Sequence, residues 1–299
     1  MISINGIKKV FVLVLALACI MSFCWTPVSA VELPFKGEIL EYIQAKGNNL
    51  AVGENIKIAL IDSGIQEDNP FIDEERILEG KNYVFDDGGT DDLIGHGTAI
   101  AGIILRKTFE TIDTTLTAEN VSVIPLVCFS RYPSGVPMNS GISGLSEAIH
   151  DAVDEFGCRI INISAGIDRK DKQLMEAIKY AEKKGAIVIS AVGNDNQNMP
   201  ERVFYPAAFE TVVGVGSVNN LGELSAFSQR NSSVMVTARG ENMEVLSLDR
   251  LEPFTTVNGT SYAAAGVTAF TSLLLSARPE TTPEEFREML IGQDLIQWH

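Results

Sequence analysis

The chain has few basic residues for its length. Its 299 residues include 23 lysines and arginines against 39 aspartates and glutamates, which gives a formal net charge of −16 at pH 7. A protein that binds nucleic acid needs a basic surface to contact the phosphates, so this balance argues against DNA or RNA as a partner. Solubility is the simplest interpretation of the acidic excess, and selection for cationic substrates is the alternative.

Long apolar runs are also scarce. The run from Val10 to Met21 has 12 residues, fewer than the roughly 20 that cross a bilayer comfortably. Two lysines, Lys8 and Lys9, precede it, and Val28-Ser29-Ala30 follows with small residues at the two positions that signal peptidase recognises. We therefore predict a secretory signal peptide over residues 1–30 and a secreted, extracellular product without a stable membrane span. The alternative is an uncleaved segment that retains the protein at the membrane.

Only four cysteines are present, and two of them lie within the predicted signal peptide. The others are Cys128, which follows the apolar run Val121–Val127, and Cys158, which precedes the run Ile160–Ser164. If these runs are neighbouring parallel strands, the two sulfurs lie at opposite ends of the sheet, roughly 15 to 20 Å apart at about 3.3 Å per residue. A disulfide needs a much shorter separation, so both residues are predicted to be free, buried thiols.

Continuous apolar runs alternate with amphipathic segments through the rest of the chain. Such a run is typical of a parallel strand covered on both faces, and we expect strands at Ile56–Ile61, Val121–Val127, Ile160–Ile163, Ala186–Ala191 and Val212–Val218. Helices are predicted at Gly144–Phe156, at Lys170–Lys184 and from Pro283, which Thr282 and Glu285 flank as a capping box. The pattern predicts an α/β fold with a mostly parallel central sheet, helices on both faces, and a site at the carboxyl ends of the strands.

Polar side chains follow or open several of these segments. The strand Ile56–Ile61 leads to Asp62, a carboxylate that a strand end can hold in the interior. His96 is one of only three histidines and opens a helix rich in glycine and alanine. The strand that ends near Val192 delivers the amide side chain of Asn194, which can donate a hydrogen bond to an oxyanion. Alone, each residue is more often structural, as a turn residue, a core histidine or a loop former.

Ser261 lies between a turn and the start of a helix of small residues. In Asn258-Gly259-Thr260-Ser261 the glycine permits a tight turn, and the free amides of the helix's first turn can stabilise negative charge beside the serine hydroxyl. A serine in this setting is most often an N-cap. A role as nucleophile therefore depends on the partners Asp62, His96 and Asn194.

In chain order, Asp62, His96, Asn194 and Ser261 resemble the subtilisin family of serine endopeptidases. The order Asp, His, Ser differs from that of chymotrypsin-like enzymes and from that of α/β-hydrolases. Three further segments are similar to the family, namely Ile161–Gly166, Tyr205–Ala207 and Val212–Gly216. The resemblance spans roughly residues 52–290 and implies a subtilisin-like three-layer sandwich, with one peptidase domain over residues 31–299.

The resemblance also implies an activity and roles for the residues. The protein would be a serine endopeptidase that acts on protein or peptide substrates through an acyl-enzyme intermediate, and its chemistry would require no cofactor. Asp62 would orient His96, and His96 would take the proton of Ser261 as that serine attacks the peptide carbonyl. The Asn194 side chain would hold the oxyanion. The walls of the main specificity pocket would be formed by Ser164, Ala165, Gly166, Ala191, Val192 and Gly193.

The small side chains of these walls imply a roomy pocket. Asp195, next to Asn194, would make the rim acidic and favour basic substrate side chains, and a solvated acid at a loop tip is the alternative. The segment Ser140–Gly144 is predicted to form the outer part of the cleft.

Two features differ from the family. Many relatives have proline and histidine where this chain has Ala265 and Gly266, so the helix that carries the nucleophile is expected to be straighter or looser. Only the 31 residues of Val31–Ile61 separate the predicted cleavage point from Asp62. Segments under about 40 residues seldom fold alone, so we predict an N-terminal arm over residues 31–51 and no folding propeptide. These features motivate a second hypothesis, a catalytically weak subtilisin-like protein that binds peptides.

Four aspartates precede His96, namely Asp86, Asp87, Asp91 and Asp92. Relatives often bind calcium through carboxylates and loop carbonyls, so a structural calcium is one interpretation of this cluster. Its spacing matches no calcium-loop signature, and a solvated acidic loop is the alternative. We therefore assign no metal ligand from the sequence.

Overall fold

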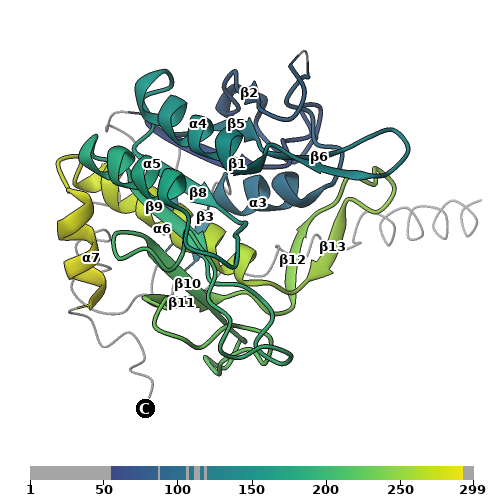
Figure 1. Cartoon of the computed structure of the whole chain (residues 1–299). Coiled ribbons are helices and arrows are strands. Elements are labelled where there is room, and N and C mark those ends of the chain that lie inside the picture. Colours follow the sequence, from purple (N-terminus) through teal and green to yellow (C-terminus); the bar gives the residue numbers. More distant parts are fainter. Residues whose placement is uncertain (1–54, 87, 106–107, 111–114, 118–119, 292–299) are drawn as a thin grey trace, which may run out of the picture. The chain divides into compact units, whose positions relative to one another are not determined.

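A parallel sheet forms the centre of the fold (Figure 1). The computed structural model describes residues 55–86, 88–105, 108–110, 115–117 and 120–291. Within them the sheet has seven strands in the order β11-β10-β9-β8-β1-β5-β2, and neighbouring strands pair in parallel. The strands are β1 (Ile56–Asp62), β2 (Lys81–Asn82), β5 (Val121–Val127), β8 (Ile160–Ile163), β9 (Ile187–Ala191), β10 (Val213–Val218) and β11 (Val236–Arg239). The predicted strands and the predicted α/β class are confirmed, with each strand within one residue of its expected bounds.

Helices cover both faces of this sheet. The helices are α3 (His96–Ile104), α4 (Gly141–Asp154), α5 (Lys172–Lys183), α6 (Thr260–Ala277) and α7 (Pro283–Ile291), with a short 3-10 turn, η2, at Glu74–Arg76. One core lies between the sheet and the pair α4 and α5, and the other lies between the sheet and α3, α6 and α7. In Figure 1, α5 lies above β9 and α6 lies below it, and α3 lies below β1.

The strand β1 shows why its sequence is continuously apolar. Ile58 and Leu60 belong to the core on the α3 and α6 side, whereas Ala59 and Ile61 belong to the core under α4 and α5. Adjacent side chains of a strand point to opposite faces, so a strand that is buried on both faces needs apolar residues at every position.

Polar side chains define the ends of two helices. At the start of α5 the Asp171 carboxylate accepts a hydrogen bond from the Leu174 amide at 3.1 Å. At the start of α7 the Thr282 amide donates to Glu285 at 2.9 Å and the Glu285 amide donates to the Thr282 hydroxyl at 3.2 Å, which is the predicted capping box. By contrast, α4 begins at Gly141, one turn before the predicted start. The predicted outer cleft segment Ser140–Gly144 therefore includes the first turn of a helix.

Three two-stranded antiparallel sheets lie outside the central sheet. The first pairs β3 (Thr108–Glu110) with β4 (Thr115–Thr117), the second pairs β6 (Phe129–Arg131) with β7 (Pro137–Asn139), and the third pairs β12 (Met243–Leu246) with β13 (Phe254–Val257). The second follows the carboxyl end of β5, and the third leads directly into α6. Both hairpins therefore connect to the edge of the sheet where a site was predicted.

Cys128 and Cys158 are both buried and free, as predicted. Burial raises the pKa of each thiol to about 12, so both are protonated at neutral pH. The assumed strand adjacency was wrong, because β1 pairs with β5 on one side and with β8 on the other. β5 and β8 are therefore not neighbours, because β1 lies between them in the sheet.

The predicted signal peptide over residues 1–30, its cleavage point and the N-terminal arm over residues 31–51 lie outside the described residues. Across the part of the chain that is described, every helix is too short or too polar to cross a membrane.

Candidate active site

The predicted site residues come together at the carboxyl edge of the sheet. Asp62 is the last residue of β1, Ser164 follows β8, and Asn194 follows β9 by three positions. Ser261 lies in the first turn of α6. Because the carboxyl ends of parallel strands meet at one edge, residues distant in the sequence share one surface there.

Asp62 and His96 form a close pair. The Nδ1 atom of His96 lies 2.8 Å from Oδ1 and 3.0 Å from Oδ2 of Asp62. The Ser63 amide donates a further hydrogen bond to Asp62 Oδ1 at 2.8 Å, and only 3% of Asp62 is exposed. An ionised carboxylate accepts hydrogen bonds only, so Nδ1 carries the proton and donates it. The Nε2 atom of His96 is then the basic nitrogen in the neutral ring.

Gly97 allows the start of α3, which carries His96, to pack closely on the loop that follows Asp62. The Gly97 amide donates to the Ser63 hydroxyl at 2.9 Å, which joins the start of α3 to the end of β1. A Cβ atom on Gly97 would lie 2.1 Å from the carbonyl oxygen of Gly64, far inside van der Waals contact. Gly64 itself has φ of 106°, a conformation that residues with a side chain rarely adopt. The first turn of α3 therefore packs backbone against backbone on the loop after β1.

Asp92 holds the start of α3. Its Oδ1 accepts hydrogen bonds from the Ile94 and Gly95 amides at 2.8 Å each, and its Oδ2 accepts from the Thr98 amide at 2.9 Å and the Thr98 hydroxyl at 2.8 Å. Only 4% of Asp92 is exposed. The interpretation of this residue as part of a solvated acidic loop was wrong, because the carboxylate is a buried cap of the helix that carries His96.

Of the other three aspartates that precede His96, the two described ones do not form a buried cap of this kind. Asp86 and Asp91 are exposed, and Asp87 lies outside the described residues. Within the described ranges no three His, Cys, Asp or Glu side chains are arranged to hold a metal ion.

Burial and the neighbouring carboxylates act on the pKa of His96 in opposite directions. Burial lowers the pKa of His96, whereas the charge and the hydrogen bond of Asp62, together with the charge of Asp92, raise it. The attraction to the two carboxylates outweighs burial, and the pKa lies above its ordinary value of 6.5. His96 is therefore a stronger base than a free imidazole.

Ser261 is 7% exposed. Its hydroxyl donates a long hydrogen bond to the carbonyl oxygen of Ser164 at 3.4 Å. The ring of Tyr262, the next residue, lies 5.7 Å from the ring of His96. The hydroxyl is thus directed to Ser164 in this structure, and the contacts of a candidate nucleophile with its base often tighten only when substrate is bound.

Asn194 is bonded to the residue before the serine. Its Oδ1 accepts from the Thr260 amide at 2.8 Å and from the Thr260 hydroxyl at 2.9 Å. Because an amide N–H must donate to an oxygen, these contacts fix the orientation of the side chain and leave its Nδ2 as a donor. A Cβ atom on Gly259 would lie 3.6 Å from this Nδ2, so the nitrogen faces the turn before Ser261.

A buried polar chain connects α6 to β8. The Thr268 hydroxyl donates to Asn162 Oδ1 at 2.9 Å, and Asn162 Nδ2 donates to the Ser164 hydroxyl at 3.1 Å. Thr268 and Asn162 are fully buried. This series of hydrogen bonds ends at Ser164, whose carbonyl oxygen accepts the hydrogen bond from Ser261. Sequence reasoning missed both residues, although a polar asparagine inside the apolar run Ile160–Ile163 was a usable signal.

The helix α6 runs without interruption from Thr260 to Ala277 and includes Ala265 and Gly266, which are both buried. The expectation of a straighter or looser helix stays a prediction. The contact of Thr268 with Asn162 lies two residues beyond Gly266 and attaches the helix to the sheet there.

Comparison with known proteins identifies the family of this chain. Residues 53–293 match the subtilase family of peptidases. The chain belongs to the subtilase family. It is therefore a subtilisin-like serine endopeptidase, as predicted.

Individual relatives agree with this assignment. The chain is 34% identical over 251 residues to the major intracellular serine protease of Bacillus subtilis strain 168, an alignment that covers 82% of this chain and 76% of that protein. It is 32% identical over 251 residues to the minor extracellular protease Epr of the same organism, across 83% of this chain and 37% of that protein. The solved structure of a cold adapted subtilisin-like serine proteinase superimposes with a TM-score of 0.64 and 25% identity, over 80% of this chain and 82% of that one.

One of the two wall segments of this subtilase borders a cleft of about 600 Å³. Ala165 and Gly166 line it on one side, and Ser140, Gly141 and Ile142 line it on another, so the predicted outer segment does reach the cleft. Among the described residues, no backbone hydrogen bond is found for Ala165 or Gly166, which leaves this short edge available to pair with an extended peptide.

The space between the walls of the subtilase is not open. Phe204 lines the same cleft and touches both walls, since Cβ atoms on Gly193 and Gly166 would lie 2.4 Å and 3.3 Å from its side chain. The expectation of a roomy pocket was therefore wrong. Small wall residues did not imply an empty space, because a distant residue fills it.

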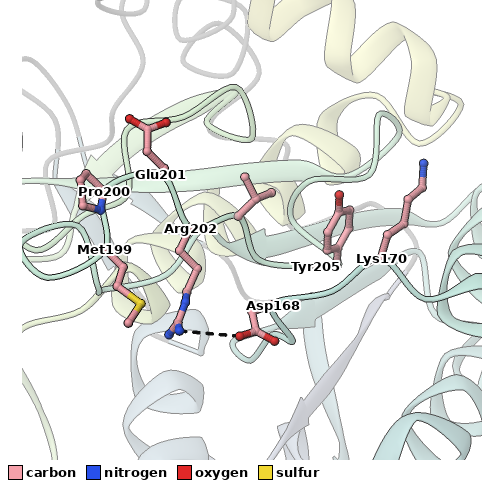
Figure 2. A pocket seen from close by; sticks show the side chains of 8 residues that line it. Asp168, Lys170, Met199, Pro200, Glu201, Arg202 and Tyr205 are labelled. Atoms are coloured by element: carbon pink, nitrogen blue, oxygen red, sulfur yellow. Dashed lines mark ion pairs between the residues drawn. The ribbon is translucent and has the colours of Figure 1, made fainter.

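Asp195 does not give the subtilase an unpaired acidic rim. Its Oδ2 lies 3.0 Å from Nη1 of Arg202, and Nη2 of Arg202 lies 3.8 Å from Oδ2 of Asp168. Figure 2 shows the Arg202 side chain directed toward Asp168, beside a second pocket of about 580 Å³. The expectation that Asp195 favours basic substrate side chains was wrong, because Arg202 compensates its charge.

Proposed function

We propose that this subtilase cleaves peptide bonds with Asp62, His96 and Ser261 as a catalytic triad. The observation that carries the proposal is the buried contact of the Asp62 carboxylate with Nδ1 of His96, at 2.8 and 3.0 Å. This contact selects the tautomer whose Nε2 is basic, and it stabilises the imidazolium that forms when a proton is taken up. A peptide-binding protein without activity has no need of this arrangement.

The chemistry follows from these positions. Nε2 of His96 accepts the proton of the Ser261 hydroxyl while the serine oxygen bonds to the peptide carbonyl carbon. The tetrahedral intermediate collapses, the C–N bond breaks, and His96 returns the proton to the leaving amine, which leaves an acyl-enzyme. Water then attacks the ester with His96 as base, and the second product leaves as a carboxylic acid while Ser261 regains its proton.

Two donors are available for the oxyanion of each tetrahedral intermediate. One is Nδ2 of Asn194, whose Oδ1 is already held by Thr260. The other is the backbone amide of Ser261, which lies in the first turn of α6 and has no intrahelical partner at that position. Donors that are fixed before the reaction stabilise developing charge without reorganisation.

We also propose that the protein is exported and cleaved after Ala30. The proposal rests on the short apolar run and its flanking residues, since the relatives include one named as intracellular and one named as extracellular. Export is tested by expression of the full chain in a secreting bacterium and sequencing of the N-terminus of the mature protein. A mature protein that begins at Val31 supports the proposal, and one that keeps residues 1–30 contradicts it.

Activity is tested by labelling with a fluorophosphonate, which transfers its phosphonyl group to an activated serine with loss of fluoride. We expect labelling of the folded protein at Ser261, loss of labelling in Ser261→Ala, and loss after heat unfolding. Absence of labelling in a folded sample would mean that the protein acts as the peptide-binding alternative and that the triad is inactive.

A further inference from the structure

Phe204 occupies the space between the two wall segments. A Cβ atom on Gly193 would lie 2.4 Å from Cδ2 and 2.7 Å from Cε2 of Phe204, so the ring sits where a side chain at position 193 would point. A Cβ atom on Gly166, on the opposite wall, would lie 3.3 Å from Cβ of Phe204. The glycines therefore make room for this phenylalanine, and the ring takes up the space that they leave.

This space adjoins the nucleophile. Gly193 precedes Asn194, and its amide donates to the Thr260 hydroxyl at 3.2 Å. On the other side Ser164, two residues before Gly166, accepts the hydrogen bond from Ser261. If a substrate residue whose carbonyl is attacked by Ser261 occupies the pocket that the resemblance assigns to these walls, its side chain points toward Phe204.

The segment that carries Phe204 is anchored on both sides. Arg202 forms an ion pair with Asp195 and a second with Asp168, which Figure 2 shows. Its guanidinium lies 5.8 Å from the centre of the Phe204 ring. The carbonyl of Arg202 accepts hydrogen bonds from Gln229 and Asn231.

On the other side of Phe204, Tyr205 exchanges two backbone hydrogen bonds with Ile167, each of 2.8 Å. Displacement of Phe204 would have to break these contacts. These contacts hold the backbone on both sides of Phe204 and so direct its side chain between the walls.

We propose that Phe204 restricts the specificity pocket to small side chains, so that this subtilase cleaves after alanine, glycine or serine in preference to large residues. The inference rests on the proposed function, because it assumes that Ser261 is the nucleophile. A single methylene changes selectivity by about 10- to 200-fold in an apolar pocket. Exclusion of a whole phenyl ring is therefore expected to give a preference of at least about 10²-fold for alanine over phenylalanine.

The test uses fluorogenic peptides that differ only at the residue that supplies the scissile carbonyl, with glycine, alanine, leucine or phenylalanine at that position. We expect kcat/KM of the wild type to be highest for the two small residues. In Phe204→Ala, kcat/KM for the phenylalanine peptide is expected to rise by at least about tenfold, while the value for the alanine peptide changes less. Phe204→Leu is expected to be intermediate and provides a variant of nearly conserved volume.

Phe129→Ala is the matched control, because Phe129 lines the same cleft without lying between the walls. It should leave the ratio of kcat/KM for the alanine peptide to kcat/KM for the phenylalanine peptide unchanged. Wild-type cleavage after phenylalanine as fast as after alanine overturns the proposal, as does an unchanged ratio in both Phe204 variants.

Phosphonate labelling distinguishes failure of the proposed role of Phe204 from failure of the proposed function. Paired peptidyl phosphonates with an alanine-like or a phenylalanine-like side chain report the same preference through the rate of labelling at Ser261. Labelling at equal rates contradicts the role of Phe204 while it supports the nucleophile. If neither reagent labels the folded protein, the proposed function fails, and the inference fails with it.

Discussion

The two ends of the proposed catalytic site are held by different kinds of contact. At the Asp62 and His96 end, buried carboxylates accept short hydrogen bonds, and the charges of Asp62 and Asp92 raise the pKa of the histidine. At the Ser261 end, the contacts of Asn194 and Thr268 are neutral and attach the start and the middle of α6 to neighbouring segments. The charged end therefore sets the protonation of His96, and the neutral end sets the position of α6 and of Ser261. The effects of substitutions at the two ends on kcat, stability and pH dependence should therefore differ.

The largest effect is expected at the charged end, in Asp62→Asn. The amide cannot serve as an acceptor for Nδ1–H with the same charge, and the neutral imidazole then favours the wrong tautomer. We expect kcat to fall by about 10⁴-fold with little change in KM. Steady-state kinetics measure this loss, and circular dichroism checks that the variant is folded. A loss of less than tenfold would show that Asp62 does not orient the base.

Asn194→Ala should have the next largest effect, with a fall in kcat of about 10² to 10³, the range known for loss of such a donor in subtilisin. Asn194→Asp is the matched variant, because its carboxylate still accepts from Thr260 but cannot donate to an oxyanion. If donation matters, Asn194→Asp is at least as impaired as Asn194→Ala. Recovery of activity in Asn194→Asp would instead assign Asn194 to positioning of Thr260.

Thr268→Val tests the neutral end with a smaller effect. It leaves the buried Oδ1 of Asn162 without its donor, which should lower the free energy of unfolding by about 1 to 3 kcal/mol. The expected fall in kcat is about tenfold, less than the roughly 10²-fold that a misplacement of 1 Å can cause.

The control for this variant lies in the same helix. Thr271 is also fully buried, but its hydroxyl donates only to the Val267 carbonyl within α6. Thr271→Val should therefore leave kcat unchanged. Denaturant unfolding and kinetics on both variants separate stability from positioning, and equal kcat values in the two would contradict a positioning role for Thr268.

The smallest effect is a shift in pH dependence. The pKa of His96 lies above 6.5, and the base must be neutral, so kcat/KM should rise with pH through an inflection above that value. Asp92→Asn removes a charge that raises this pKa, and the inflection should move to lower pH. Asp91→Asn, at the exposed neighbouring aspartate, should leave the profile unchanged. A shift of equal size in both variants would indicate a general effect of net charge.

The elements and residues that follow local sequence rules were predictable. β1 and β5 are continuous apolar runs, and Asp62, His96 and Ser261 occur in motifs whose order resembles a family. The role of Asp92 was not predictable, because four aspartates look alike until the start of α3 buries one of them.

The position of Phe204 was not predictable for a different reason. It lies far along the chain from Gly166, and only the contacts between loops bring its ring between the walls. Local pattern therefore indicates which elements and catalytic residues exist, whereas the specificity of the cleft depends on long-range packing.

The position of β1 in the sheet has a consequence for the order in which activity arises. β1 comes early in the described chain, yet it lies between β5 and β8, which are both synthesised later. Asp62 therefore remains at the end of an unpaired strand while the ribosome makes the middle of the protein. Ser261 emerges later still, at the start of α6. A nascent chain consequently lacks part of the proposed triad until nearly all of the domain has been made, and hydrolysis by that triad would begin only with the finished fold.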